Sequence, residues 1–570
     1  MTFPFLPTNK AEMRLKGWDS VDIILITGDA YVDHPSFGAA LIGRYLESRG
    51  FRVGIIAQPD WTKDDDFLAL GKPNLFFGVT GGNLDSMIAN YNSEKKSRKK
   101  DEYTAGGEPG KRPDRAVIVY TNMIRKLFPG SPVIIGGLEA SLRRLTYYDY
   151  WSNKLRRSIL FDSKADLLVY GMGEKAIVAA AERLKDFRDL KGIKNTAYIS
   201  DRKPSGDILD LPAHEILLKE KVLYLKAVKE HEQEYAKKKP RKVVQECQKK
   251  FIIAEPPDPL NSKELDELYT LPFTREPHPG YQEPIPAYSF VKHSVVAHRG
   301  CYGGCSFCTL TLHQGKYIVS RSEKSILNEI QNVIGKQQDF KGNILDIGGP
   351  SADMWQSRCK KLEGCGRLSC LVPSVCPNLE IGHKQQLSLL QKARSLPGIK
   401  RIFINSGIRI DQALLCPQYI DELTRYHVSG QLSLAPEHNA SDVLKLMQKP
   451  KFSLYEQFVK LFNKANKKYH KEQYIIPYLI ASHPGCTLQN MHNLSEYLRQ
   501  NKLRVQQVQN YIPIPMTLSS AMYYSETDPF SLKPIHVAKG EERRLQRALL
   551  QPWLKANKPL HRKALEILKK

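Results

Sequence analysis

Two successive runs of alternating strand and helix patterns limit the folds open to this chain of 570 residues. From position 21, short and almost continuously apolar segments alternate with stretches whose apolar residues recur at helical spacing. The strand candidates include VDIILITG, RVGIIAQP, AVIVYTN and SPVIIGGL. Strands without polar residues are buried on both faces, as in parallel sheets covered by helices. We therefore predict a doubly wound parallel α/β domain over residues 1–200.

The alternation starts afresh at about Tyr288 and gives six strand candidates separated by helical sequence. They are SFVKHSVVA, GNILDIGG, IKRIFINSG, VSGQLSLAPE, YIIPYLIASHPG and RVQQVQNYIP. Six such units in order favour a parallel barrel, closed or partial, with its functional residues in the loops that follow the strands. Between the two runs, residues 201–286 combine basic stretches with a helical pattern, and we predict a basic helical linker there.

Three cysteines follow the first strand of the second run. Cys301, Cys305 and Cys308 are spaced C-x3-C-x2-C in CYGGCSFC, a loop of small residues that can wrap around a bulky ligand. A four-iron cluster requires a ligand on each iron, usually a cysteine thiolate. Three thiolates leave one iron open to a small chelating molecule. A zinc ion completed by His298 or His313 is the competing interpretation.

Four further cysteines lie in CKKLEGCGRLSCLVPSVC, an insertion over residues 359–376. Cys359, Cys365, Cys370 and Cys376 can hold a structural zinc ion or an auxiliary iron-sulfur cluster, with disulfides or unliganded thiols as the remaining alternatives. The two sets account for seven of the ten cysteines, a clustering that indicates ligands rather than disulfide staples. The second set contains no CxxC pair, so its spacing leaves the metal open.

CYGGCSFC resembles the signature of the radical S-adenosylmethionine (SAM) enzymes. Longer segments, among them GGLEASLRR, DIGGPSADM, SLAPEH and QNYIPIPMTLSSAMYY, resemble the YgiQ-type radical SAM family over nearly the whole chain. The resemblance implies a flavodoxin-like or cobalamin-binding-like first domain. It also implies, over residues 287–570, a radical SAM (β/α)6 partial TIM barrel with a C-terminal helical extension. The implied function is that of an enzyme whose substrate and reaction are unidentified.

The same resemblance implies the cofactors. Cys301, Cys305 and Cys308 would hold a [4Fe-4S] cluster, and SAM would chelate the fourth iron. Reductive cleavage of SAM would then start radical chemistry on the substrate. An electron donor of flavodoxin or ferredoxin type is the expected partner.

Further site residues follow by matching motifs. Gly348 and Gly349 in DIGGP match the glycine pair that meets the methionine amino group of SAM, although Pro350 stands where an acidic residue is usual. Glu437 in SLAPEH matches the residue that commonly contacts the SAM ribose, and Ser433 is its neighbour on the same strand. The segment ASHPGCT matches the stretch that cradles the adenine.

Some radical SAM proteins carry a doubly wound first domain that binds cobalamin. The ligand signature D-x-H-x-x-G is absent here, because VDHPSFG places Asp33 directly before His34 and Gly38 one position late. Cobalamin is therefore the weaker expectation. We interpret the domain as flavodoxin-like and used for substrate or partner contact.

The formal net charge of +25 favours a polyanion as partner and keeps RNA or another anionic macromolecule open as the substrate. The alternative function is that of a zinc-binding, nucleic-acid-interacting protein without radical activity. No apolar run approaches the roughly 20 residues of a membrane span, and the first residues lack a signal-peptide core. We therefore expect a cytoplasmic protein.

Overall fold

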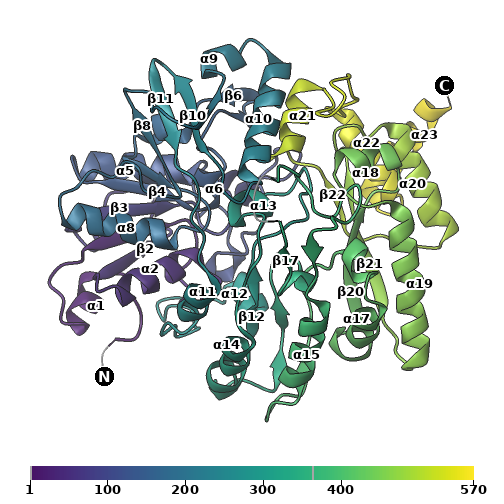
Figure 1. Ribbon diagram of the computed structural model, residues 1–570, viewed down its shortest axis with the longest axis horizontal. Coiled ribbons are helices and arrows are strands. Elements are labelled where there is room, and N and C mark those ends of the chain that lie inside the picture. Colours follow the sequence, from purple (N-terminus) through teal and green to yellow (C-terminus); the bar gives the residue numbers. More distant parts are fainter. Residues whose placement is uncertain (1–2, 362–364, 570) are drawn as a thin grey trace. The chain divides into compact units, whose positions relative to one another are not determined.

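The computed structural model describes residues 3–361 and 365–569, which form two compact units (Figure 1). The first unit comprises residues 1–219 and 239–294, and the second comprises residues 220–238 and 295–570. Helix α10 (Lys221–Tyr235) therefore belongs to the second unit, although the sequence on both sides of it belongs to the first.

The first unit is built on a nine-stranded sheet in the order β2-β1-β3-β4-β7-β8-β11-β10-β9. The first five strands in this order run parallel, and antiparallel pairs follow from β7 to β10. This confirms the predicted doubly wound sheet. The strands of the unit are β1 (Ile23–Thr27), β2 (Val53–Ala57), β3 (Phe76–Thr80), β4 (Val133–Gly136), β5 (Tyr147–Asp149), β6 (Lys154–Arg156), β7 (Leu167–Val169), β8 (Thr196–Ser200), β9 (Ile208–Leu211), β10 (Lys242–Cys247) and β11 (Lys250–Ala254).

Helices cover the parallel strands, and every residue of β1 is buried as a result. Residues of α2 and α8 share one hydrophobic core with Ile23 and Leu25, whereas α5 packs on β3 and β4. The helices of the unit are α1 (Lys10–Leu15), α2 (Gly38–Ser48), α3 (Asp65–Leu68), α4 (Ser86–Asn90), α5 (Ala116–Leu127), α6 (Gly137–Ser141), α7 (Ile159–Ser163), α8 (Glu174–Lys185), α9 (His214–Leu217), α11 (Ser262–Leu268) and α12 (Pro286–Val291).

The segment AVIVYTN, predicted to be a strand, forms the start of helix α5 instead. A short apolar run cannot be assigned to strand or helix by periodicity alone. The buried residues Ala116, Val117, Tyr120 and Ile124 recur at helical spacing, but the last of them lies beyond the apolar run.

The predicted basic helical linker over residues 201–286 is wrong for most of its length. Strands β9, β10 and β11 lie within it and extend the sheet of the first unit. Strands β10 and β11 form a hairpin around Gln248 and Lys249, whose φ angles of 53° and 60° suit a two-residue turn with both central residues left-handed. The segment was predicted to be a solvated helix because lysines are frequent in the hairpin and on both sides of it.

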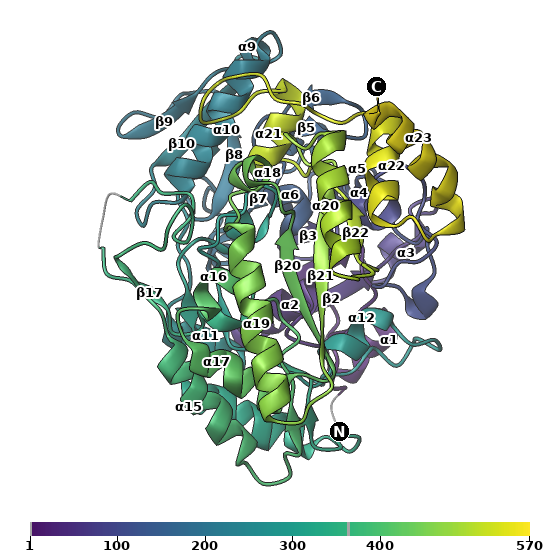
Figure 2. The ribbon, with the colours of Figure 1, turned by 90° about the vertical axis from the view of Figure 1, so that its right-hand side faces the viewer.

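The second unit contains the short strands predicted for the partial barrel, in several small sheets, and Figure 2 shows β20 and β21 side by side. β12 pairs with β16, β15 runs parallel to β19, and β20, β21 and β22 form a parallel sheet. The strands are β12 (Ser294–Val296), β13 (His298–Arg299), β14 (Val319–Ser320), β15 (Asn343–Ile344), β16 (Asp346–Gly348), β17 (Arg358–Cys359), β18 (Leu379–Glu380), β19 (Arg401–Ile402), β20 (Gln431–Glu437), β21 (Tyr474–Ala481) and β22 (Val508–Asn510).

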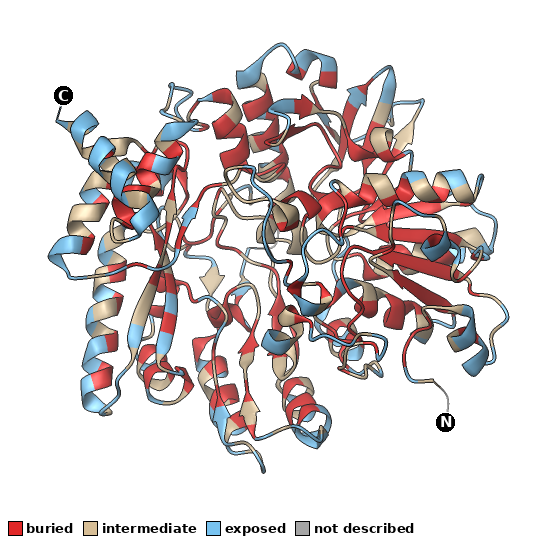
Figure 3. Cartoon of the chain, turned by 180° about the vertical axis from the view of Figure 1, so that it is seen from behind, coloured by how far each residue is buried: buried red, intermediate tan, exposed pale blue. Residues whose placement is uncertain are grey.

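Helices pack on these strands through apolar stripes, and Figure 3 shows buried and exposed residues alternating along them. On α19, Tyr455, Phe458 and Phe462 join a core that includes Ile344 and Ile402. The helices are α13 (Leu310–Gln314), α14 (Glu323–Asn328), α15 (His383–Arg394), α16 (Ile410–Ala413), α17 (Pro417–Glu422), α18 (Ser441–Leu446), α19 (Phe452–Lys468), α20 (Leu488–Gln500), α21 (Leu518–Ser525), α22 (Glu541–Leu550) and α23 (Lys558–Leu568). No helix in residues 3–361 and 365–569 has the length and apolar character needed to cross a membrane.

Candidate functional site

The three cysteines of CYGGCSFC lie on the loop between β13 and α13. The amide of Cys301 donates to the carbonyl of Gly315, and the amide of Cys308 donates to that of Cys305, both at 3.0 Å. Burial, followed by the neighbouring Cys305 thiol, raises the pKa of Cys301 to about 11 and that of Cys308 to about 12. The three half-buried cysteines therefore bring their thiols close together, and a cationic ligand would be required to hold them all as thiolates.

A guanidinium faces this loop. Nη1 of Arg409 lies 3.2 Å from Sγ of Cys305, and a Cβ on Gly303 would lie 3.2 Å from the same nitrogen and 3.4 Å from Sγ of Cys301. Asp411 accepts hydrogen bonds from Nε and Nη2 of Arg409 at 3.1 and 2.7 Å. Arg409 is not among the site residues predicted from the sequence. The available signal was a charged residue among apolar ones, in INSGIRI, directly after a predicted strand.

Gly348 and Gly349 lie at the end of β16, where close packing requires glycine. A Cβ on Gly348 would lie 2.8 Å from Cβ of Ser406, and one on Gly349 would lie 2.6 Å from Cε1 of His298. The carbonyl of Gly348 accepts a hydrogen bond from the amide of Ala297 at 2.6 Å. His298, one of the two histidines considered for a zinc site, packs against this turn rather than joining the cysteines.

Strand β20 ends in a strained backbone that brings Glu437 into the site. Its φ is 66°, in the left-handed region, and the pairing with β21 shifts register just before it. The buried carboxylate lies 3.6 Å from Nζ of Lys449, and burial raises its pKa against the opposing effects of Lys449 and Arg409. The carbonyl of Met447, two residues before Lys449, accepts from the amide of Ser306 at 3.1 Å, so Glu437 and its lysine lie beside the cysteine loop. Ser433, by contrast, lies four residues before the strand end and is exposed.

Buried polar atoms collect at the ends of the last three parallel strands. Asn439 and Ser482 follow β20 and β21, and Asn510 ends β22. Among the described residues, Oδ1 of Asn439, Oγ of Ser482 and both side-chain polar atoms of Asn510 have no hydrogen-bond partner. Unsatisfied buried polar groups are costly, so their concentration at one end of the barrel favours a polar ligand there.

The second cysteine set lies on the insertion that begins with β17. All ten cysteines of the chain are free, and no disulfide joins the four of this set. In residues 3–361 and 365–569, no three His, Cys, Asp or Glu side chains meet as ligands of a single metal ion.

In the first unit, protein groups occupy the corresponding strand ends. The Asp29 carboxylate accepts from the amide of Asn83 at 2.6 Å and pairs with Arg112 at 2.8 Å. Glu139, beyond the Gly136 and Gly137 turn, accepts from two backbone amides. These carboxylates are therefore engaged by their own chain.

His34 does not fit the role of a cobalt ligand. Its Nδ1 accepts from the amide of Ser36 at 3.1 Å, and its Nε2 lies 3.1 Å from Nη1 of Arg275. Both ring nitrogens are occupied and the ring is buried, in line with the absence of the cobalamin signature.

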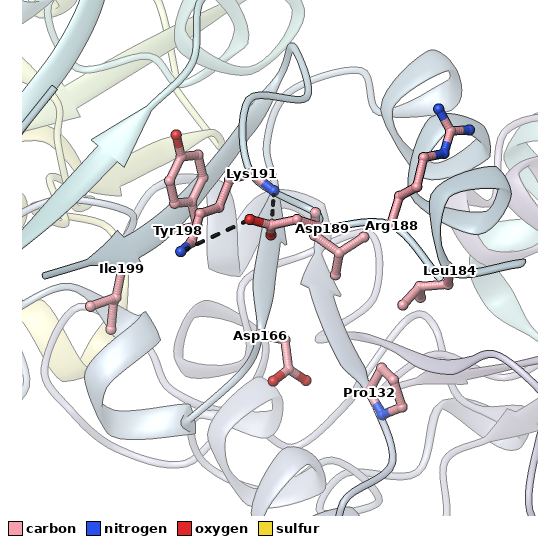
Figure 4. A pocket seen from close by; sticks show the side chains of 9 residues that line it. Pro132, Asp166, Leu184, Arg188, Asp189, Lys191, Tyr198 and Ile199 are labelled. Carbon is pink, nitrogen blue, oxygen red and sulfur yellow. Dashed lines mark hydrogen bonds and ion pairs between the residues drawn. The ribbon is translucent and has the colours of Figure 1, made fainter. Parts of the chain in front are cut away.

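A surface hollow of about 300 Å³ lies at the amino ends of the parallel strands in the nine-stranded sheet of the first unit (Figure 4). Its lining includes Pro132 and Asp166, which directly precede β4 and β7, together with Lys191 and Tyr198. Ligands of doubly wound sheets bind at the carboxyl ends of the strands, so this hollow at the amino ends is not the site we assign.

Comparisons with known proteins place these features in a family. Residues 5–294 match the model described as Radical SAM N-terminal, and residues 506–569 match a domain of unknown function. A UPF0313 protein of Methanocella arvoryzae is 47% identical over 98% of this chain and 94% of its own. One of Bradyrhizobium diazoefficiens is 44% identical over 99% of this chain and 89% of its own. Among solved structures, the chain is similar to the radical S-adenosylmethionine methyltransferase TsrM from Kitasatospora setae, which was solved with cobalamin and a [4Fe-4S] cluster bound. The match covers 96% of this chain and 100% of the TsrM chain, with 13% sequence identity and a TM-score of 0.50.

Proposed function

The chain belongs to the UPF0313 family and is a radical SAM enzyme, and we propose that its second unit holds a [4Fe-4S] cluster and SAM to start radical chemistry on a still unidentified substrate. The resemblance to the YgiQ-type radical SAM family is thereby confirmed. One observation carries the proposal: three neighbouring thiols lie at the carboxyl ends of the barrel strands, beside Arg409, Glu437 and Lys449.

The residues fit these cofactors in number and chemistry. Cys301, Cys305 and Cys308 would each ligate one iron, leaving the fourth iron to SAM. When both are bound, the cluster supplies the electron that cleaves SAM reductively. Because Gly303 has no side chain, the guanidinium of Arg409 can approach the thiols. This cationic group would offset part of the negative charge of the site.

The strand ends would hold the organic part of SAM. The carboxylate of Glu437 can accept hydrogen bonds from ribose hydroxyls, and Lys449 holds it in place. Gly349, packed on His298, would present its backbone to the methionine end. The unpartnered atoms of Ser482 and Asn510 are available to the adenine or to the substrate.

Metal content and SAM cleavage test the proposal. Anaerobic reconstitution should place roughly four irons on the first cysteine set, and dithionite with SAM should yield 5′-deoxyadenosine. We predict that Cys305→Ala abolishes this product, because one iron loses its ligand. The matched control Cys416→Ala, at a partly exposed thiol outside both sets, should retain product formation. Zinc without iron in the wild type would instead favour the zinc-binding alternative.

We further propose a donor of flavodoxin or ferredoxin type, since such a donor would supply the electron and the net charge of +25 suits an acidic partner. The same charge supports RNA or another anionic macromolecule as the substrate, which salt-dependent retention on RNA would test. Ten free cysteines fit the reducing cytoplasm.

A further inference from the structure

The four cysteines after β16 lie on one hydrogen-bonded fold of the chain. Cys359 in β17 is paired with Leu379 in β18, and the amide of Leu379 donates to the carbonyl of Cys376 at 3.0 Å. The amide of Cys376 donates to the carbonyl of Cys370 at 2.7 Å, and the amide of Cys370 donates to that of Tyr302 at 3.0 Å. Backbone hydrogen bonds therefore hold three of the four thiols in fixed relation.

The fourth thiol is also close. The Lys316 ammonium and the thiols of Cys376, Cys359 and Cys365 are the charged or ionisable groups that act on the Cys370 thiol. Cys370 and Cys376 are buried, at 6% and 8% exposure, although no disulfide joins them. Four free thiols on one hydrogen-bonded fold of the chain, two of them buried, are suited to a shared ligand.

The spacing of the thiols distinguishes between the two kinds of ligand. A zinc ion holds each thiolate at about 2.3 Å, so its ligands crowd around one point. A four-iron cluster takes each thiolate on a different iron, so its ligands are farther apart. Among the described residues, neither cysteine set brings three ligands together at the spacing of a single ion. From this geometry we propose that Cys359, Cys365, Cys370 and Cys376 bind a second iron-sulfur cluster of the [4Fe-4S] type.

The surroundings suit an anionic cluster. Nζ of Lys316, a residue only 3% exposed, donates to the carbonyl of Arg367 and lies near Cys370. The guanidinium of Arg367 donates to the carbonyls of Ser369 and Ser374 at 3.1 and 2.9 Å and so closes the loop between Cys365 and Cys376. Two basic side chains are thereby fixed within the cysteine loop, where they would offset the negative charge of four thiolates.

The second site directly adjoins the first. Tyr302, whose carbonyl receives the Cys370 amide, is the residue after Cys301, and one apolar cluster contains Tyr302, Cys370 and Cys376, with Cys301 packed against it. Gly304 has φ of 61°, and a Cβ there would lie 2.9 Å from Cα of Ser369, so the two loops touch backbone to backbone. Because four thiolates leave no iron open, the second cluster would not bind SAM.

Iron counting on two complementary variants tests this proposal separately from the proposed function. The wild type should bind about eight irons, and Cys365→Ser/Cys370→Ser about four. In that double variant the electron paramagnetic resonance (EPR) spectrum should still change when SAM is added. Cys301→Ala/Cys305→Ala/Cys308→Ala should also retain about four irons, with a spectrum insensitive to SAM.

Several results would overturn the second cluster. One is a wild type with about four irons and one zinc ion, the zinc being lost in the double variant. Another is an iron-free triple variant whose circular dichroism matches the wild type, a measurement that remains decisive even if the double variant does not fold. An unresponsive EPR spectrum in a folded double variant with about four irons would count against the SAM site alone.

Discussion

At the residue scale, Arg409 is the charged group in direct contact with the first cysteine set. Its Nη1 lies 3.2 Å from Sγ of Cys305, and Asp411 holds the other side of the guanidinium. A reduced cluster carries one more negative charge than an oxidised one. A fixed cationic donor to a ligating sulfur therefore stabilises the reduced form and raises the reduction potential.

We predict that Arg409→Gln lowers the midpoint potential of the first cluster by about 60 mV, because a hydrogen bond to a charged group contributes about 1.5 kcal/mol or more and a one-electron couple shifts by 59 mV for each tenfold change. An EPR-monitored redox titration of the Cys365→Ser/Cys370→Ser background isolates this cluster. Arg409→Lys, which keeps the charge, should shift the potential less. Equal potentials in all three proteins would contradict this assignment.

At this scale, sequence reasoning reaches the residues that one continuous motif contains. Cys301, Cys305 and Cys308 could be selected because spacing alone places them on one short loop. Arg409 could not, because its contact with Cys305 joins residues 104 positions apart and depends on two strand ends meeting. Lys449 was missed for the same reason, since only the fold brings it to Glu437.

At the scale of elements, helix α10 is attached to the second unit through a buried carboxyl group. Glu232 on α10 accepts from the amide of Leu518, at the start of α21, at 2.8 Å. The residue is partly exposed, but its carboxyl is buried, and burial raises the pKa of Glu232 to about 8 against the opposing Leu518 hydrogen bond. The carboxyl is therefore neutral below that pH in the folded protein.

We predict that Glu232→Gln stabilises the second unit at pH 8 and has little effect at pH 5. The group is protonated when folded and ionises near pH 4.3 when unfolded, so rising pH destabilises the wild type by about 1.4 kcal/mol per pH unit until the folded group ionises. Urea unfolding at both pH values measures the difference. Glu230→Gln, on the exposed face of the same helix, is the control, and an equal gain from both substitutions would refute the argument.

A whole element could be predicted where its own residues determine its structure, and not where contacts with distant segments determine it. The strands of the doubly wound sheet could be predicted because burial on both faces leaves β1 entirely apolar. The hairpin of β10 and β11 could not, because its half-exposed strands are defined by pairing with β8 and β9 rather than by composition. The run AVIVYTN failed because its helical partners, such as Ile124, lie beyond it.

At the scale of the whole molecule, four of the buried histidines of the second unit are neutral when folded. Burial lowers the pKa of His298 and His483 to about 3 and that of His383 and His438 to about 4. An unfolded histidine titrates near pH 6.5. The unfolded chain therefore binds more protons below that pH, and the second unit loses stability as the pH falls.

The expected loss is large compared with the stability of a typical domain. One pH unit below the pKa of the unfolded state, each histidine lowers the free energy of unfolding by about 1.4 kcal/mol. Four histidines therefore lower it by about 6 kcal/mol at pH 5.5, whereas the whole free energy of unfolding of a typical domain is about 5–15 kcal/mol. We predict that the second unit opens between about pH 6 and 5, as loss of hydrogen-exchange protection in its peptides. Iron-free protein should be used so that acid release of a cluster does not contribute.

His383→Gln should reduce the pH dependence of the free energy of unfolding by about one quarter. This holds whatever stability the substitution costs at neutral pH by removing the ring stacked 5.0 Å from Tyr419. His470→Gln, at an exposed position, should leave the slope unchanged. A wild-type slope in His383→Gln would show that these rings already accept protons in the folded unit.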